Sequence, residues 1–194
     1  MARIAGVKSI HIAKIQSYGE NGKPTYGEIK ELKQFISFSS TKNFSEMNWY
    51  SNDIVEETFK SVVDMELEIV LGKLDNETKG LIMGSEYNSK GVLVEKADDA
   101  QAEFAVIVVL SQMGTTNGTV NQVFYRTKLT MDGLSAETKT DSVTDSQLTL
   151  TGRAIPLSDG RISCTIDSLD PKADAEVIAN WTRSVYDSTQ SPSL

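Results

Sequence analysis

One stretch of this chain, residues 62–71, strongly restricts how its own segment can fold. It reads V-V-D-M-E-L-E-I-V-L, so that acidic and apolar side chains alternate. Successive side chains of a β-strand point to opposite faces. A strand here would therefore carry Asp64, Glu66 and Glu68 on one face and apolar side chains on the other. Because a shift of one residue would bury the three carboxylates, the pattern predicts a strand with one core face and one acidic face.

Hairpin signals divide most of the remaining sequence. Four Asn-Gly or Asp-Gly pairs, which favour tight turns, begin at Asn21, Asn117, Asp132 and Asp159 and separate stretches rich in β-branched and aromatic residues. We expect strands over residues 7–17, 29–39, 56–71, 91–95, 102–112, 120–131, 147–156 and 161–167. Residues 102–110 are apolar on both faces, which predicts a central strand. The fold class that follows is mainly β: an antiparallel sandwich or barrel-like fold.

Two short helices are expected to interrupt this pattern. The first covers about residues 75–83, with Asp75 or Asn76 as N-cap and Gly84 at its end. The second begins at the Asp170-Pro171 pair, which supplies an N-cap followed by proline at the first helical position. It presents Val177, Ile178 and Trp181 on one stripe, which docks either on its own sheet or on a neighbouring subunit. The chain then divides into a β domain (1–169), a helical extension (170–186) and a disordered tail (187–194).

A long loop is expected between strands at residues 39–55. It is far longer than an ordinary hairpin loop and carries Phe44, Met47, Trp49 and Tyr50. Side chains this large need a surface against which to bury. They either pack on the core of their own domain or serve as anchors in a protein interface.

Composition and motifs argue against several functions. The net charge of −8 disfavours binding to nucleic acid or to anionic lipid, and the sequence contains no apolar run long enough to cross a membrane. Cys164 is the only cysteine and His11 the only histidine, which leaves no cysteine- or histidine-rich metal site. No phosphate-binding glycine motif occurs. The three alternating acids have the spacing of a glycosidase pair, but any alternating acids would have it. We therefore expect no enzyme, no cofactor and no metal.

Several short motifs, in this order, resemble a known family. They are I-A-G-V-K-S-I-H-I-A-K-I near the start, T-Y-G-E-I-K-E-L, N-W-Y-S-N-D followed by V-E-E, L-T-G-R-A-I-P-L-S-D-G-R and D-S-L-D-P. Together they resemble the major tail proteins, or tail tube proteins, of long non-contractile-tailed phages (siphoviruses) of Gram-positive hosts, and most of all those of staphylococcal phages and prophages.

The resemblance implies a structural protein of the virion tail, assembled in the host cytoplasm. Copies of the chain would form hexameric rings that stack into a tube around a tape-measure protein. The tube would meet tail terminator and baseplate or distal tail proteins at its ends. Viral DNA would pass through its lumen without specific binding.

This interpretation gives roles to the residues singled out above. Asp64, Glu66 and Glu68 would line the lumen, the alternative being a solvated outer face. Phe44, Met47, Trp49, Tyr50 and Asp53 would reach the next ring or the neighbouring subunit. Two other functions remain open: the tube of a contractile injection or secretion machine, and a carbohydrate-binding β-sandwich in which Trp49, Tyr50 and Trp181 stack on sugar rings.

Overall fold

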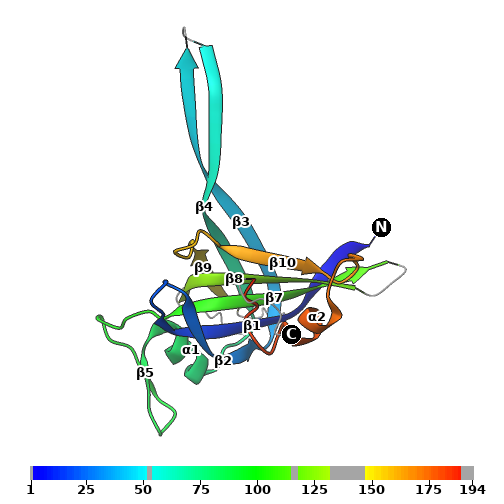
Figure 1. Ribbon diagram of the computed structural model, residues 1–194. Helices are drawn as coiled ribbons and strands as arrows, with labels where there is room; N and C mark the ends of the chain where they lie inside the picture. Colours follow the sequence, from blue (N-terminus) through cyan, green and yellow to red (C-terminus); the bar gives the residue numbers. More distant parts are fainter. Residues whose placement is uncertain (1, 52–53, 115–117, 132–146, 189–194) are drawn as a thin grey trace, which may run out of the picture.

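Antiparallel strands make up most of the protein. The computed structural model describes residues 2–51, 54–114, 118–131 and 147–188 (Figure 1). The strands are β1 (Arg3–Tyr18), β2 (Pro24–Leu32), β3 (Phe35–Ser51), β4 (Ile54–Leu71), β5 (Glu86–Tyr87), β6 (Leu93–Val94), β7 (Glu103–Met113), β8 (Gly118–Met131), β9 (Leu148–Ala154) and β10 (Ser163–Asp167); the helices are α1 (Asn76–Met83) and α2 (Ala175–Asn180). The predicted mainly β, antiparallel fold is confirmed.

One eight-stranded sheet forms the body of the molecule. The strand order is β2-β1-β7-β8-β9-β4-β3. β9 and β10 share one edge of β8: β10 pairs with its first half and β9 with its second half. Only Lys33 and Gln34 separate β2 from β3, although these strands stand at opposite ends of the order. The sheet must therefore curl until its two ends meet at this turn. Curling produces two layers that face each other.

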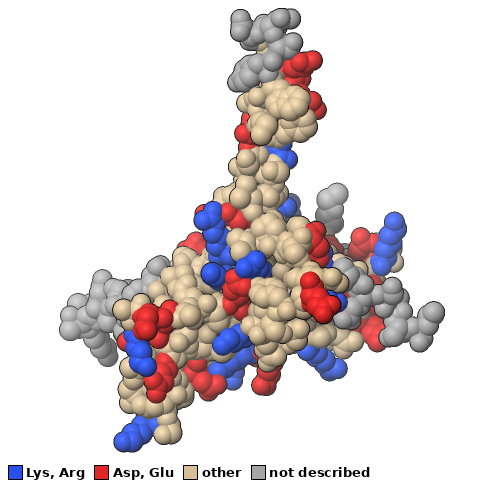
Figure 2. All heavy atoms as spheres, turned by 60° about the vertical axis from the view of Figure 1, so that its left-hand side comes forward, with Lys and Arg blue, Asp and Glu red and all other residues tan. Residues whose placement is uncertain are grey.

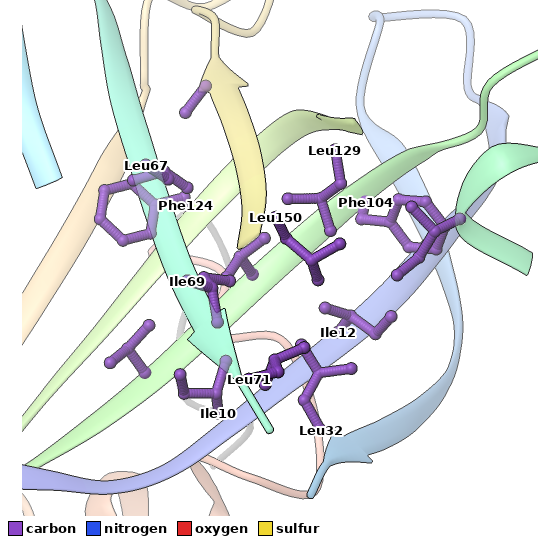
Figure 3. Close-up of a cluster of buried hydrophobic side chains, with 14 of the residues drawn as sticks. Ile10, Ile12, Leu32, Leu67, Ile69, Leu71, Phe104, Phe124, Leu129 and Leu150 are labelled. Carbon is purple, nitrogen blue, oxygen red and sulfur yellow. The ribbon is translucent and has the colours of Figure 1, made fainter. Parts of the chain in front are cut away.

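The main core lies between these layers (Figure 3). The apolar face of β4 supplies Leu67, Ile69 and Leu71, and β1 supplies Ile10 and Ile12 from the other side. All five are at most 2% exposed. Burying a side chain of this size contributes about 1.5–3 kcal/mol. The alternation in residues 62–71 thus places its apolar face in the core, as predicted.

The C-terminal segment covers the outer face of the layer formed by β1, β7 and β8. A second apolar cluster on this face includes Ile107, Val109 and Tyr125, with Trp181 from beyond α2 packed onto it. β7 is therefore buried on both faces, which explains its continuous apolar sequence. The predicted central position of β7, between β1 and β8, is confirmed.

The two helices differ in how well the sequence signals mark them. In α1, Asp75 is the N-cap and accepts a hydrogen bond from the Thr78 N–H, and Gly84 ends the helix with a φ of 76°. Both caps are as predicted. α2 is shorter than the expected helical extension, because Asp174 and not Asp170 caps it: Asp174 Oδ1 accepts from the backbone N–H groups of Glu176 and Val177.

Two strand predictions around residues 29–55 are wrong. The single strand expected over 29–39 is divided by the turn at Lys33 and Gln34. The long loop expected over 39–55 belongs instead to β3 and β4, whose cross-strand pairs run from Phe35 opposite Leu71 to Ser51 opposite Ile54. The structure thus replaces the loop with a long hairpin.

The outer half of this hairpin projects from the body (Figure 1). β9 pairs with β4 only over Met65–Leu71, so that residues 44–51 of β3 and 54–63 of β4 pair only with each other in the described chain. We call this projecting ribbon the arm. At about 3.3 Å per residue it extends about 25 Å.

Candidate functional site

One face of the arm is apolar and open to solvent. Met47 on β3 stands directly opposite Phe59 on β4, and Trp49 is the next residue of β3 on the same face. Met47, Trp49 and Phe59 are 61%, 59% and 47% exposed. The rings of Trp49 and Phe59 meet edge to face with centroids 5.6 Å apart, and Trp49 Nε1 donates to Met47 Sδ at 3.4 Å. We call these three residues the arm patch.

The opposite face of the arm pairs its polar groups internally. Lys60 and Glu46 form an ion pair at 2.9 Å, and the Thr58 hydroxyl donates to Asn48 Oδ1 at 2.7 Å. Phe44 lies on this face at the root of the arm, where it is 55% exposed. Beyond Phe44 the arm is therefore amphipathic: one face pairs its polar side chains with each other, and the other presents exposed apolar surface.

Such a ribbon has little support of its own beyond the body of the sheet. An isolated two-stranded hairpin is marginally stable in water, because it has no core beneath it. A clustered exposed apolar surface generally marks a protein interface. Ile54 and Val55, near the end of the arm, are also exposed. The arm patch is thus a candidate interaction surface.

A polar face covers the layer formed by β3, β4, β9 and β8, on the side away from the core. Cross-strand neighbours fall into two rows: Thr41, Glu66, Arg153 and Lys128 in one, and Ser39, Glu68, Thr151 and Thr130 in the next. These side chains line an open groove of about 560 Å³. The alternating acids of β4 therefore share a face with cations from β8 and β9.

Asp64 belongs to the same face but is buried. Asp64 as a whole residue is only 2% exposed. Arg153 donates to Asp64 Oδ2 from Nε at 2.8 Å and from Nη2 at 2.5 Å, and Asn43 Nδ2 donates to Asp64 Oδ1 at 2.8 Å. The hydrogen bonds from Arg153, and next those from Asn43, hold the pKa of Asp64 below its ordinary value. Glu66 and Glu68 remain exposed.

The expected acidic ladder is in consequence a face of mixed charge. Glu66 stands opposite Arg153, Arg153 opposite Lys128, and Lys128 opposite Glu103 on β7. Figure 2 shows the same mixture, with basic and acidic side chains next to one another on the body below the arm. Opposite charges at neighbouring cross-strand positions stabilise a sheet and reduce the field that the face presents to solvent.

The two ends of the sheet present unpaired strand edges. β2 and β3 are the terminal strands of the order, and each has one edge without a partner strand in the part of the chain that the structure describes. Open edges of this kind offer backbone N–H and C=O groups to another chain.

The sequence of residues 43–177 matches the model of the phage tail tube protein family. The chain belongs to the phage tail tube protein family. The matched region runs from the root of the arm to α2 and covers well over half of the sequence. A search of curated proteins found no match.

Family membership defines the general role of the protein. A tail tube protein is a structural component of the virion tail and assembles with copies of itself into a tube. The arm patch and the open sheet edges are surfaces suited to such self-assembly. No helix in the described ranges is both long and apolar enough to cross a membrane.

The predicted C-terminal docking residues of this tail tube protein lie against its own sheet. Trp181 is 3% exposed and stacks on Tyr186, with centroids 5.5 Å apart. Val177 and Ile178 are both half-buried, and Val177 packs beside Trp181 in the second apolar cluster. Because Trp181 is covered, the suggestion that it stacks on sugar rings together with Trp49 is wrong.

The predicted site residues of the 39–55 segment do not form a single surface. The structure brings Met47 and Trp49 together and separates them from Phe44, which lies on the other face of the arm. The Tyr50 side chain and the whole of Asp53 lie outside the described residues. Phe59 and Arg153 are not among the residues predicted from the sequence. Phe59 stands between the polar residues Thr58 and Lys60, and this alternation could have predicted the face on which it lies. Arg153 is 89 residues from its partner Asp64, so no local pattern connects them.

His11 and Cys164 are the only histidine and the only cysteine of the chain, and the surroundings of each are consistent with a structural role. His11 Nε2 lies 3.1 Å from Ser9 Oγ, and burial lowers its pKa against the influence of Glu31. Burial raises the pKa of Cys164. Among the described residues, no group of three or more His, Cys, Asp or Glu side chains is arranged to hold a metal ion.

Proposed function

We propose that this tail tube protein is the major tail protein of a siphovirus, with a long non-contractile tail and a Gram-positive host of the staphylococcal type. Copies would form hexameric rings that stack into the tube through which viral DNA is ejected. The observation that carries the proposal is the arm patch, an exposed apolar surface of Met47, Trp49 and Phe59 on a ribbon with no core of its own.

The arm patch would contact a second copy of the chain. The arm extends about 25 Å beyond the sheet, so its apolar face can reach past its own subunit. A contact between an arm and a different surface of the next subunit is heterologous, and repeating it along an axis gives an open filament. Aromatic side chains at the centre of an interface generally carry much of its binding energy.

The open edges of β2 and β3 would close each ring. Pairing the β3 edge of one subunit with the β2 edge of its neighbour satisfies both rows of backbone groups. Repetition around an axis would join the sheets into one barrel without edges. Each subunit then uses two kinds of contact: strand pairing within a ring and arm docking between rings.

The polar face of β3, β4, β9 and β8 would line the lumen, with Glu66 and Glu68 as its exposed acids. Arg153 and Lys128 offset much of their charge. Screening limits the reach of each charge to about 8 Å at physiological salt. A tape-measure protein, and later DNA, would pass a hydrated surface that neither holds nor strongly repels a polyanion. Terminator and distal tail proteins would close the tube at its ends.

Electron microscopy of purified protein tests the docking role of the arm. We expect the double variant Trp49→Ser with Phe59→Ser to remain folded and to lose stacked tubes, because the apolar contact is removed. The matched control is Thr58→Ala on the opposite face of the arm, which should form tubes of normal length. Normal tubes from the Trp49 and Phe59 double variant would contradict the proposal.

Virion infectivity tests the luminal role. Glu66→Lys with Glu68→Lys should permit tube assembly but slow DNA ejection, because added cations bind phosphate. Asp64 is left unchanged, since its carboxylate is already bound by Arg153. Glu20→Lys with Glu95→Lys makes the same change of charge at exposed positions outside the strands, as a control. Normal infectivity of the Glu66 and Glu68 variant with intact tubes would reject the luminal placement.

A further inference from the structure

The arm leaves the body of the protein at one defined point. The last pair between β4 and β9 joins Met65 to Ala154. Immediately beyond it, Asn43 stands opposite Asp64 but Phe44 stands opposite Val62, so that Val63 is an extra residue in β4. A β-bulge of this kind bends its strand and increases the local twist. The three-stranded support therefore ends where the bulge begins.

Asp64 occupies the position between that last pair and the bulge. It accepts hydrogen bonds from Asn43 on β3 and from Arg153 on β9, and so connects three strands by side chains. Asn43 Nδ2 also donates to Glu66 Oε1 at 3.1 Å. The Asp64 side chain is 3% exposed, whereas that of Arg153 is 64% exposed. We call Asn43, Asp64 and Arg153 the root clamp.

We propose that Asp64 is a positioning residue for the arm: by holding Asn43 and Arg153, it fixes the direction in which the arm leaves the sandwich. Without the clamp, this direction would depend on the bulged backbone pairing and on the packing of Val62 against the main core. A swing of about 10° at the root would move the end of a ribbon about 25 Å long by about 4 Å. A displacement of that size would separate the arm patch from a partner surface.

The function of this positioning rests on the proposed docking of the arm onto a second copy. Association must offset the entropy lost when mobile groups become ordered. An arm that is already held in its docking direction loses less entropy on assembly. The clamp would thus favour assembly without itself contacting the partner.

Distances between spin labels on the unassembled protein test the clamp directly. Labels at Glu56→Cys on the arm and Thr165→Cys on β10, in a Cys164→Ser background, report the direction of the arm relative to the body. At a protein concentration where the chain is monomeric, we expect a narrow distance distribution. Asp64→Asn should broaden and shift it, because the amide cannot accept from Arg153 with both the charge and the geometry of the carboxylate.

A second ion pair supplies the matched control. Arg126 binds Glu103 at 2.9 and 3.1 Å on β8 and β7, away from the root of the arm. Glu103→Gln should lower stability without broadening the distribution. If Asp64→Asn does not fold, Asn43→Ala, which leaves the Asp64–Arg153 pair intact, should broaden the distribution to a smaller extent. An unchanged distribution in the folded Asp64 or Asn43 variant would overturn the proposal.

Tube formation by the same variants separates this inference from the proposed function. A broadened distribution together with short or absent tubes supports the role of the clamp in assembly. A broadened distribution with normal tubes would overturn that role. If the Trp49 and Phe59 double variant forms normal tubes, the docking proposal fails instead, whatever the distance measurements show.

Discussion

Arg161, in the connection between β9 and β10, binds Asp187 through its Nη1 at 2.9 Å from Asp187 Oδ1. The same guanidinium lies 5.1 Å from the centre of the Tyr125 ring, and Lys23 also pairs with Asp187. The end of the described C-terminal segment is therefore attached to the sheet that it covers. Asp187→Ala should lower the free energy of unfolding by about 1 kcal/mol, because the charges are partly exposed. Urea unfolding followed by tryptophan fluorescence measures this, and Asp98→Ala, at an exposed site, should leave stability unchanged.

Trp181 should contribute far more to stability than its neighbours in the same segment. It is 3% exposed and packs in the second apolar cluster. Truncating a buried tryptophan to alanine generally costs about 3–5 kcal/mol. Ile178→Ala, at a half-buried position, should cost much less. Equal losses in the two variants, measured by urea unfolding followed by circular dichroism, would show that the segment is not anchored through Trp181.

The sequence identified the features of this fold that depend on local patterns. Alternation alone placed Leu67 and Ile69 in the core, and the caps of α1 followed from Asp75 and Gly84. These patterns suffice because each concerns residues close together in the chain. A strand or a short helix with ordinary caps can be recognised without knowing what lies beside it.

The arm and the burial of Asp64 depend on more than local pattern. Met47 and Trp49 alternate with Glu46 and Asn48, as in an amphipathic strand, but the local pattern does not show whether such side chains are covered by their own domain or by a partner. In the structure this apolar face is uncovered. Asp64 was grouped with Glu66 as an exposed acid, since the partner that buries it, Arg153, comes 89 residues later.

Protonation of Asp64 should weaken the fold in acid. Its pKa is lowered in the folded protein, chiefly by the hydrogen bonds from Arg153, relative to an unfolded value near 4. The resulting stabilisation is present above the unfolded pKa and is lost as the pH falls through the folded pKa. The difference in free energy of unfolding between the wild type and Asp64→Asn should therefore be largest above pH 5 and shrink below about pH 4. Urea unfolding at several pH values measures it, and a difference that grows in acid would contradict the assignment.

Gln34 should be a site where a single substitution stabilises the protein. It lies in the turn between β2 and β3 with a φ of 57°, a left-handed conformation that disfavours residues with a Cβ. Its carbonyl accepts from the Gly72 N–H at 2.8 Å, and this backbone bond does not depend on the side chain. Gln34→Gly should therefore relieve strain and raise the free energy of unfolding by about 0.5–1 kcal/mol, even though glycine makes the unfolded chain more flexible. Lys33→Gly, at the other residue of the turn, gains no such relief and should lower stability. Urea unfolding measures the change in free energy of unfolding that each variant causes. The two changes have opposite signs if the backbone conformation of Gln34 is the cause, and the same sign if it is not.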